Sequence, residues 1–136
     1  MTQPIQWSDA FKVGIEKIDF QHKNLYEAIS RFLTAVAENK DVAEIKKMLD
    51  FVGNYIFEHF STEEDYMGRY EYPAALHHKS EHQAFIEEFR RMKNQYELDG
   101  ATKFISLQLE GWLISWLQKH VAGSDTALGL FLKKKL

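Results

Sequence analysis

Residues 45–67 read IKKMLDFVGNYIFEHFSTEEDYM, and their spacing decides the fold. Apolar residues recur in this stretch at steps of three and four, which is the spacing of one buried face on an α-helix. The same face carries His59 and Glu63, although a carboxylate is almost never fully buried without a partner. The stretch therefore predicts a long helix whose core-facing side holds polar groups among the apolar ones.

Three further segments show the same spacing, at residues 15–36, 78–96 and 105–120. Only short stretches connect the four segments. Amphipathic helices with short connections pack against their chain neighbours in opposite directions. The sequence therefore predicts an all-α fold, an up-down-up-down antiparallel four-helix bundle over about residues 15–132.

The bundle is expected to form a single domain that covers residues 1–136. An irregular N-terminal arm, residues 1–14, precedes the bundle, and a short basic C-terminal tail follows it. Trp7 and Phe11 of the arm are expected to cover one end of the core. Residue types that favour helix ends predict caps at three positions, Asp41, Gly100 and Thr102.

Composition excludes several classes of function. With 136 residues, 45% hydrophobic, the chain is long enough for one domain with a real core. Its net charge of -3 argues against nucleic acid as a partner. The absence of cysteine excludes disulfides, thiolate metal sites and iron–sulfur clusters. No apolar run reaches the roughly 18 residues of a membrane helix, and the N-terminus lacks a secretory signal. We therefore expect a soluble, cytoplasmic protein without membrane contact.

The histidines are the unusual feature of this chain. Five of the six fall on the apolar faces, and only His77 does not. A lone histidine on such a face is more often satisfied within the core than bound to a metal, and His59 with Glu63 could form a surface pair. If the helices alternate in direction, however, one metal centre explains all five together. These five are His22, His59, His78, His82 and His120.

Asp125 adds a second carboxylate to Glu63. It follows His120 by five residues, which places it about 140° away on a regular helix. For both to reach one site, the chain must depart from α-helical geometry near Gly123 and Ser124, and a π-type bulge is one way to do so. Five histidines and two carboxylates exceed the ligands of a tetrahedral zinc site. Two metals that share both carboxylates and a bridging oxygen would use all seven residues and leave one position for a small exogenous ligand.

The combined pattern resembles the hemerythrin family, and in particular single-domain bacterial hemerythrins, over nearly the whole chain. Four pieces carry the resemblance: QHKNL at residues 21–25, HFSTE at 59–63, HKSEH at 78–82 and WLQKHVAGSD at 116–125. Each piece alone is weak. Their order along the chain, H, HxxxE, HxxxH and HxxxxD, is highly specific.

The resemblance implies a cofactor of two non-haem iron ions with a bridging oxide or hydroxide. One iron would be coordinatively full and the other would keep an open position for O₂ or a small anion such as azide. By the family pattern the full iron would be held by His78, His82 and His120, the open iron by His22 and His59, and both by the bridging Glu63 and Asp125.

The family's O₂ pocket falls on apolar positions of this chain, Leu25, Phe60, Trp116 and Leu117. An apolar shell excludes water and protons from a bound ligand, although the same side chains would also serve as ordinary core packing. Leu128 is a departure, because family members often carry an aromatic residue three positions after the bridging aspartate.

The resemblance implies reversible O₂ binding by an oxygen carrier, store or delivery protein that is not an enzyme and is expected to be a monomer. The alternatives are a di-iron oxidase or peroxidase-like enzyme, a metal-stabilised bundle without O₂ chemistry, and an O₂- or redox-sensing module that acts through a partner. Ferritin-like oxidases use Glu-x-x-His pairs, and this chain contains none. Zinc remains a competing metal, because it binds many nitrogen and oxygen sites more tightly than ferrous iron.

Overall fold

The computed structural model describes residues 11–99 and 103–136, and it confirms the all-α fold. The four long helices are α1 (Glu16–Ala37), α2 (Val42–Arg69), α3 (Ala75–Asp99) and α4 (Lys103–His120). A π-helical turn, Val121–Asp125, follows α4 directly and leads into the short helix α5 (Thr126–Lys133).

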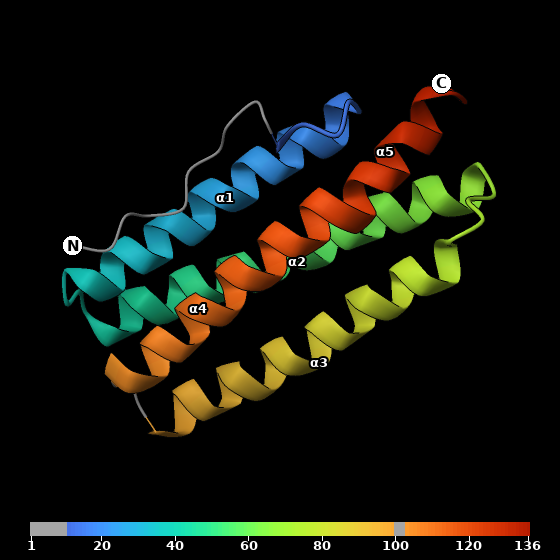
Figure 1. Cartoon of the computed structure of the whole chain (residues 1–136). Coiled ribbons are helices and arrows are strands. Elements are labelled where there is room, and N and C mark those ends of the chain that lie inside the picture. The colour runs from blue at the N-terminus through green and yellow to red at the C-terminus, as the bar shows by residue number, and fades with distance from the viewer. Residues whose placement is uncertain (1–10, 100–102) are drawn as a thin grey trace.

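The helices run alternately up and down the bundle, as the short connections predict (Figure 1). The helix α5 continues α4 beyond the π-helical turn, so that α4, the turn and α5 together span the length of the bundle. Consequently one end of the bundle holds the start of α1, the end of α2, the start of α3 and α5. Residues far apart in sequence therefore meet at the same level.

Buried apolar side chains form two separate clusters along the bundle axis. The larger cluster draws on all four long helices and continues to Val121. The smaller one, which we call the lower core, contains Val13, Ile15, Ile18, Met67, Leu128 and Leu132. In α1 and α2 a short polar segment separates the residues of one cluster from those of the other, and His78 and Asp125 lie at the same position along the bundle. The fold thus places a polar layer between two apolar ones.

The ends of two helices show how side chains fix the chain locally. Asp41 caps α2, because its carboxylate accepts a hydrogen bond from the backbone N–H of Ala43 at 3.0 Å. Asp19, in the first turn of α1, accepts from the backbone N–H groups of Val13 and Gly14 and so ties the arm to the helix. Three residues of the predicted arm and caps lie outside the described residues, Trp7, Gly100 and Thr102.

The C-terminal helix packs closely against the arm. Leu128 and Leu132 are fully buried in the lower core, and a Cβ at Gly129 would lie 2.3 Å from the carbonyl oxygen of Val13. Phe11 packs against the larger cluster, with its ring centroid 5.5 Å from that of Tyr26.

Among the described residues, no helix has both the length and the apolar character needed to cross a bilayer.

Candidate metal centre

The polar layer consists of the seven residues that sequence reasoning singled out. Each of their side chains is at most 3% exposed. Burial of so many ionisable groups is costly unless they are paired or bind a metal. They come from every long helix and from the π-helical turn, and they are His22, His59, Glu63, His78, His82, His120 and Asp125.

Glu63 faces histidines on both sides of the layer. Its Oε1 lies 3.0 Å from Nε2 of His82 and 3.4 Å from Nε2 of His78, both on α3. Its Oε2 lies 3.7 Å from Nε2 of His59, one turn earlier on α2. The two oxygens of this carboxylate thus face different imidazoles, as a bridging carboxylate requires.

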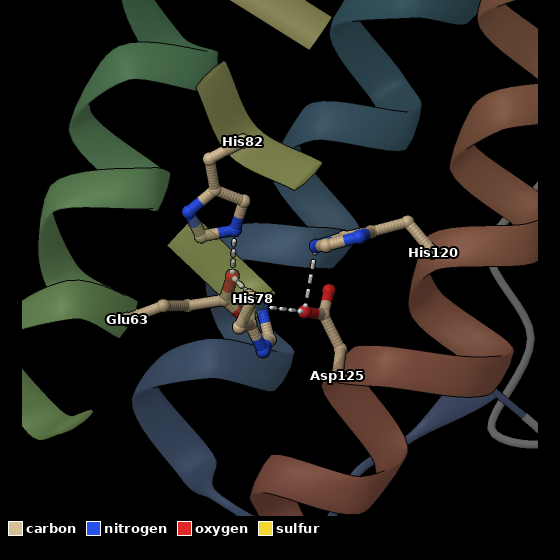
Figure 2. Close-up of side chains that lie close together, drawn as sticks. All are labelled: Glu63, His78, His82, His120 and Asp125. Carbon is tan, nitrogen blue, oxygen red and sulfur yellow. Dashed lines mark hydrogen bonds and ion pairs between the residues drawn. The ribbon is translucent and has the colours of Figure 1, made fainter. Parts of the chain in front are cut away.

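Asp125 repeats this arrangement from the opposite side (Figure 2). Its Oδ1 lies 3.0 Å from Nε2 of His120 and 3.1 Å from Nε2 of His78. Its Oδ2 lies 2.9 Å from Nε2 of His22 on α1. Figure 2 shows Glu63 in contact with His82 and His78, and Asp125 in contact with His78 and His120, so that His78 lies between the two carboxylates.

The π-helical turn is what allows Asp125 to reach this layer. It spans Val121–Asp125, and a backbone N–H in the following turn donates to the carbonyl of Val121. The wider winding of a π-helix absorbs one additional residue per turn relative to the α-helix. Asp125 therefore faces the same side as His120, and the predicted departure from α-helical geometry near Gly123 and Ser124 is confirmed.

The seven residues form two groups, each able to hold one metal ion. The three-histidine group is Glu63, His78, His82, His120 and Asp125, and the two-histidine group is His22, His59, Glu63 and Asp125. Within each group the potential ligand atoms lie within 4.8 Å of one another. The two carboxylates belong to both groups.

The hydrogen bonding of these atoms fits metal ligation. Eight buried nitrogen and oxygen atoms of the layer have no hydrogen-bond partner. Buried polar groups in proteins are otherwise nearly always satisfied. Imidazole nitrogens with carboxylate oxygens form a donor set suited to iron and zinc. Cations between these residues would satisfy seven of the eight atoms, all but Nδ1 of His22, so the residues present fit a metal centre.

The electrostatics of the layer point the same way. Burial, reinforced by neighbouring histidines, lowers the pKa of His59 to about 3 and that of His82 to about 2. These imidazoles are therefore neutral at pH 7, as metal ligation requires. Burial and the nearby Asp125 raise the pKa of Glu63 well above its usual value. Burial alone would raise the pKa of Asp125. Its contacts with His120, His22 and His78 outweigh burial and hold that pKa well below its usual value. A cation between the carboxylates would stabilise the ionised form of both.

A small apolar cavity of about 10 Å³ adjoins the layer. Both histidines of the two-histidine group line it, as do His120 and Asp125. The four positions proposed for the pocket, Leu25, Phe60, Trp116 and Leu117, are all among its walls. Sequence reasoning missed the rest of the apolar lining, because nothing in their spacing distinguishes these residues from ordinary core: Ile29, Ile56, Phe85 and Leu113.

Three polar residues outside the seven also touch the imidazoles, and sequence reasoning missed them. Gln21, Glu64 and Glu81 accept hydrogen bonds from Nδ1 of His59, His82 and His120 respectively. Each of the three is adjacent in sequence to one of the seven residues, which is the only signal that could have found them. His77 is exposed, as its position off the apolar face predicts.

The comparison with known families agrees with this geometry. Residues 13–129 match the model of the hemerythrin HHE cation-binding domain. The chain belongs to the hemerythrin family. Membership makes it a non-haem iron-binding domain and confirms the resemblance drawn from the sequence. The match covers the whole polar layer and, apart from Leu132, the buried residues of both apolar clusters.

Curated hemerythrins are similar to this chain over most of its length. A bacteriohemerythrin of Clostridium acetobutylicum is 31% identical over 125 residues, which cover 88% of this chain and 94% of that protein. A bacteriohemerythrin of Stenotrophomonas maltophilia is 31% identical, over 89% of this chain and 76% of the relative. A hemerythrin-like protein of Naegleria gruberi is 29% identical, over 90% of this chain and 88% of the relative.

Proposed function

We propose that this chain binds O₂ reversibly at a non-haem di-iron centre. One iron would be held by His78, His82 and His120, the other by His22 and His59, and Glu63 and Asp125 would bridge them. A bridging oxide or hydroxide would complete the centre. The assignment is supported by the contacts of both carboxylates, because the two oxygens of each one face histidines of different groups.

The single observation that carries the proposal is the position of the cavity. The three-histidine group offers five protein ligands, but the two-histidine group offers only four. Both histidines of the two-histidine group, His22 and His59, line the cavity, whereas His120 is the one histidine of the three-histidine group that does so. A small molecule that enters the cavity therefore meets the metal position that the protein fills less completely.

The residues around the cavity would control what reaches that position. The irons would supply the reversible electron transfer that holds O₂. Leu25, Phe60 and Leu117, each at most 4% exposed, would exclude water from it. Exclusion of water also keeps protons away, and so favours release of O₂ over its further reduction. Azide and similar small anions would compete for the same space.

We further propose that the chain acts as a carrier, store or delivery protein in the cytoplasm, as a monomer and not as an enzyme. Histidine ligands contribute less negative charge than carboxylates do. This composition favours retention of O₂ over cleavage of its bond, in contrast to the carboxylate-rich sites of di-iron oxidases.

Oxygen uptake by protein reconstituted anaerobically with ferrous iron tests this function. The proposal predicts uptake of about one O₂ for every two irons, because the two metals act together at one open position. Evacuation should return the O₂. Continuous consumption of O₂ in the presence of a reductant would instead identify an oxidase, and no uptake by fully loaded protein would contradict O₂ binding.

A further inference from the structure

Three histidines of the polar layer are held from outside by different partners. In His59, His82 and His120, Nε2 faces the centre and Nδ1 faces away from it. Nδ1 of His82 donates to Oε2 of Glu64 at 3.0 Å, and Nδ1 of His120 donates to Oε2 of Glu81 at 3.4 Å. Nδ1 of His59 donates instead to the amide oxygen of Gln21 at 2.9 Å. An acceptor at Nδ1 places the proton there and leaves the Nε2 lone pair for a metal.

The orientation of the Gln21 amide is fixed by its other contact. Its Nε2 donates to the hydroxyl oxygen of Thr62 at 3.0 Å. That hydroxyl in turn donates to the carbonyl oxygen of Glu58 at 3.1 Å, so it can only accept from Gln21. The amide oxygen must therefore face His59. The group that accepts the hydrogen bond from His59 is therefore an uncharged amide oxygen.

The Glu81 carboxylate also contacts the π-helical turn. Its Oε1 accepts a hydrogen bond from the hydroxyl of Ser124, inside the π-helical turn. One side chain of α3 thus holds both His120 and the turn that carries Asp125. On its outer side Glu81 also faces the exposed His77, with Oε1 3.4 Å from Nε2 of that ring.

The hydrogen-bond acceptors at Nδ1 differ in charge between the three-histidine group and the two-histidine group. Both outer partners described for the three-histidine group are carboxylates, whereas the two-histidine group has an amide at His59 and no hydrogen-bond partner at Nδ1 of His22. A carboxylate that accepts the Nδ1 proton makes Nε2 a stronger donor to a metal than an amide does.

We propose that Glu64 and Glu81 are positioning residues that make the three-histidine group the tighter of two divalent-cation positions, and that Gln21 keeps the two-histidine group weaker. This inference rests on the proposed two-metal centre. The two groups already differ in their number of protein ligands, five against four, and the inference adds a contribution to that difference from side chains that touch no metal.

Titration of the metal-free full chain with Co²⁺, followed by calorimetry and visible absorption, tests the inference. The unmodified chain should bind in two steps of different affinity, and His59→Ala should abolish the weaker step. The double variant Glu64→Gln/Glu81→Gln keeps both acceptors but removes their charge. It should weaken the tighter step about 10-fold or more, towards the 10- to 100-fold range for loss of such partners, and leave the weaker step nearly unchanged. Gln21→Glu should strengthen the weaker step.

Glu87→Gln, at an exposed position of α3, is the matched control and should change neither step. The melting temperature of each metal-free variant separates positioning from folding, and it should match that of the unmodified chain. Equal weakening of both steps, unchanged steps in all variants, or loss of affinity in parallel with loss of metal-free stability would overturn the inference. A single Co²⁺ per unmodified chain would instead contradict the two-metal centre itself.

Discussion

Nε2 of His120 lies 3.0 Å from Oδ1 of Asp125, although the two residues are five positions apart on one continuous helical segment. The π-helical turn between them makes this contact possible. The other oxygen of Asp125 lies 2.9 Å from Nε2 of His22. Asp125 therefore belongs to both groups of the polar layer, whereas His59 belongs to the two-histidine group alone.

Loss of Asp125 should affect metal binding more than loss of His59. The unmodified chain should contain about two irons when purified with iron available, because seven ligands exceed the needs of one metal. Asp125→Ala removes a ligand from both groups and should lower the content of both irons. His59→Ala removes a ligand from the two-histidine group alone and should lower the content towards one iron. Elemental analysis of the purified variants measures this.

His77→Ala is the control for these substitutions. His77 is 80% exposed and lies outside both groups, so its loss should leave the iron content unchanged. If His77→Ala and His59→Ala lowered the content equally, the assignment of ligands by helical face would be wrong.

The fold and six of the seven residues of the layer, all but Asp125, were predictable from the sequence for one physical reason. A helix repeats every 3.6 residues, so polar groups on an apolar face must point into the core. His22, His59 and His82 were therefore visible as anomalies. Even the irregular turn before Asp125 followed from its spacing to His120, since a regular α-helix would have directed that carboxylate away from the centre.

Removal of the metal should lower the stability of the protein. Eight buried atoms of the layer lack hydrogen-bond partners, and each unsatisfied group costs about 1–3 kcal/mol. A metal that binds only the folded chain adds its binding free energy to stability. The melting temperature should thus fall by about 10 °C or more after chelation. Calorimetry before and after chelation at neutral pH measures this, and superimposable melting curves would contradict a buried metal centre.

Leu117 should protect the bound ligand without holding the iron. It lies one turn before His120 and lines the cavity, with 4% of its surface exposed. Leu117→Ala should cost about 2–5 kcal/mol of stability, as large-to-small substitutions in a core do. Iron content should stay near that of the unmodified chain, while the oxygenated form decays faster to the ferric state and azide binds faster. Stopped-flow absorption measures both rates.

Leu109→Ala provides the matched control. Leu109 is 1% exposed on the same helix but is not part of the cavity lining. Leu109→Ala should lower the free energy of unfolding by a similar amount and leave the decay rate of the oxygenated form unchanged. Equal decay rates for the two variants and the unmodified chain, with iron retained, would show that Leu117 is only a core residue.

Gly129 should tolerate no side chain, because the backbone of the arm occupies the space. An added Cβ would lie 2.3 Å from the carbonyl oxygen of Val13 and 2.8 Å from its Cβ. Gly129→Ala should therefore destabilise the protein by about 1–3 kcal/mol through overpacking. Gly111→Ala, on α4 with open space around it, should instead stabilise by about 0.5–1 kcal/mol. Denaturant unfolding of both variants measures the difference, and effects of the same sign would contradict the packing of α5 on the arm.

The outer partners of the histidines were not predictable from the sequence. Gln21, Glu64 and Glu81 are polar residues next to ligand positions, and polar residues at such positions usually face water. Their role depends on where a side chain from one helix meets the ring of another, as Gln21 of α1 meets His59 of α2. Helical periodicity gives the face of each residue but not the rotation and translation of one helix against its neighbour.

The optical spectrum of the iron-loaded, reduced protein through repeated cycles of air and vacuum tests the central claim most directly. A band from charge transfer between bound oxygen and iron should appear in air, disappear under vacuum and return with little loss in the next cycle. A spectrum that does not change in air, or a band that forms once and passes irreversibly to the ferric state, would contradict reversible O₂ binding at this centre.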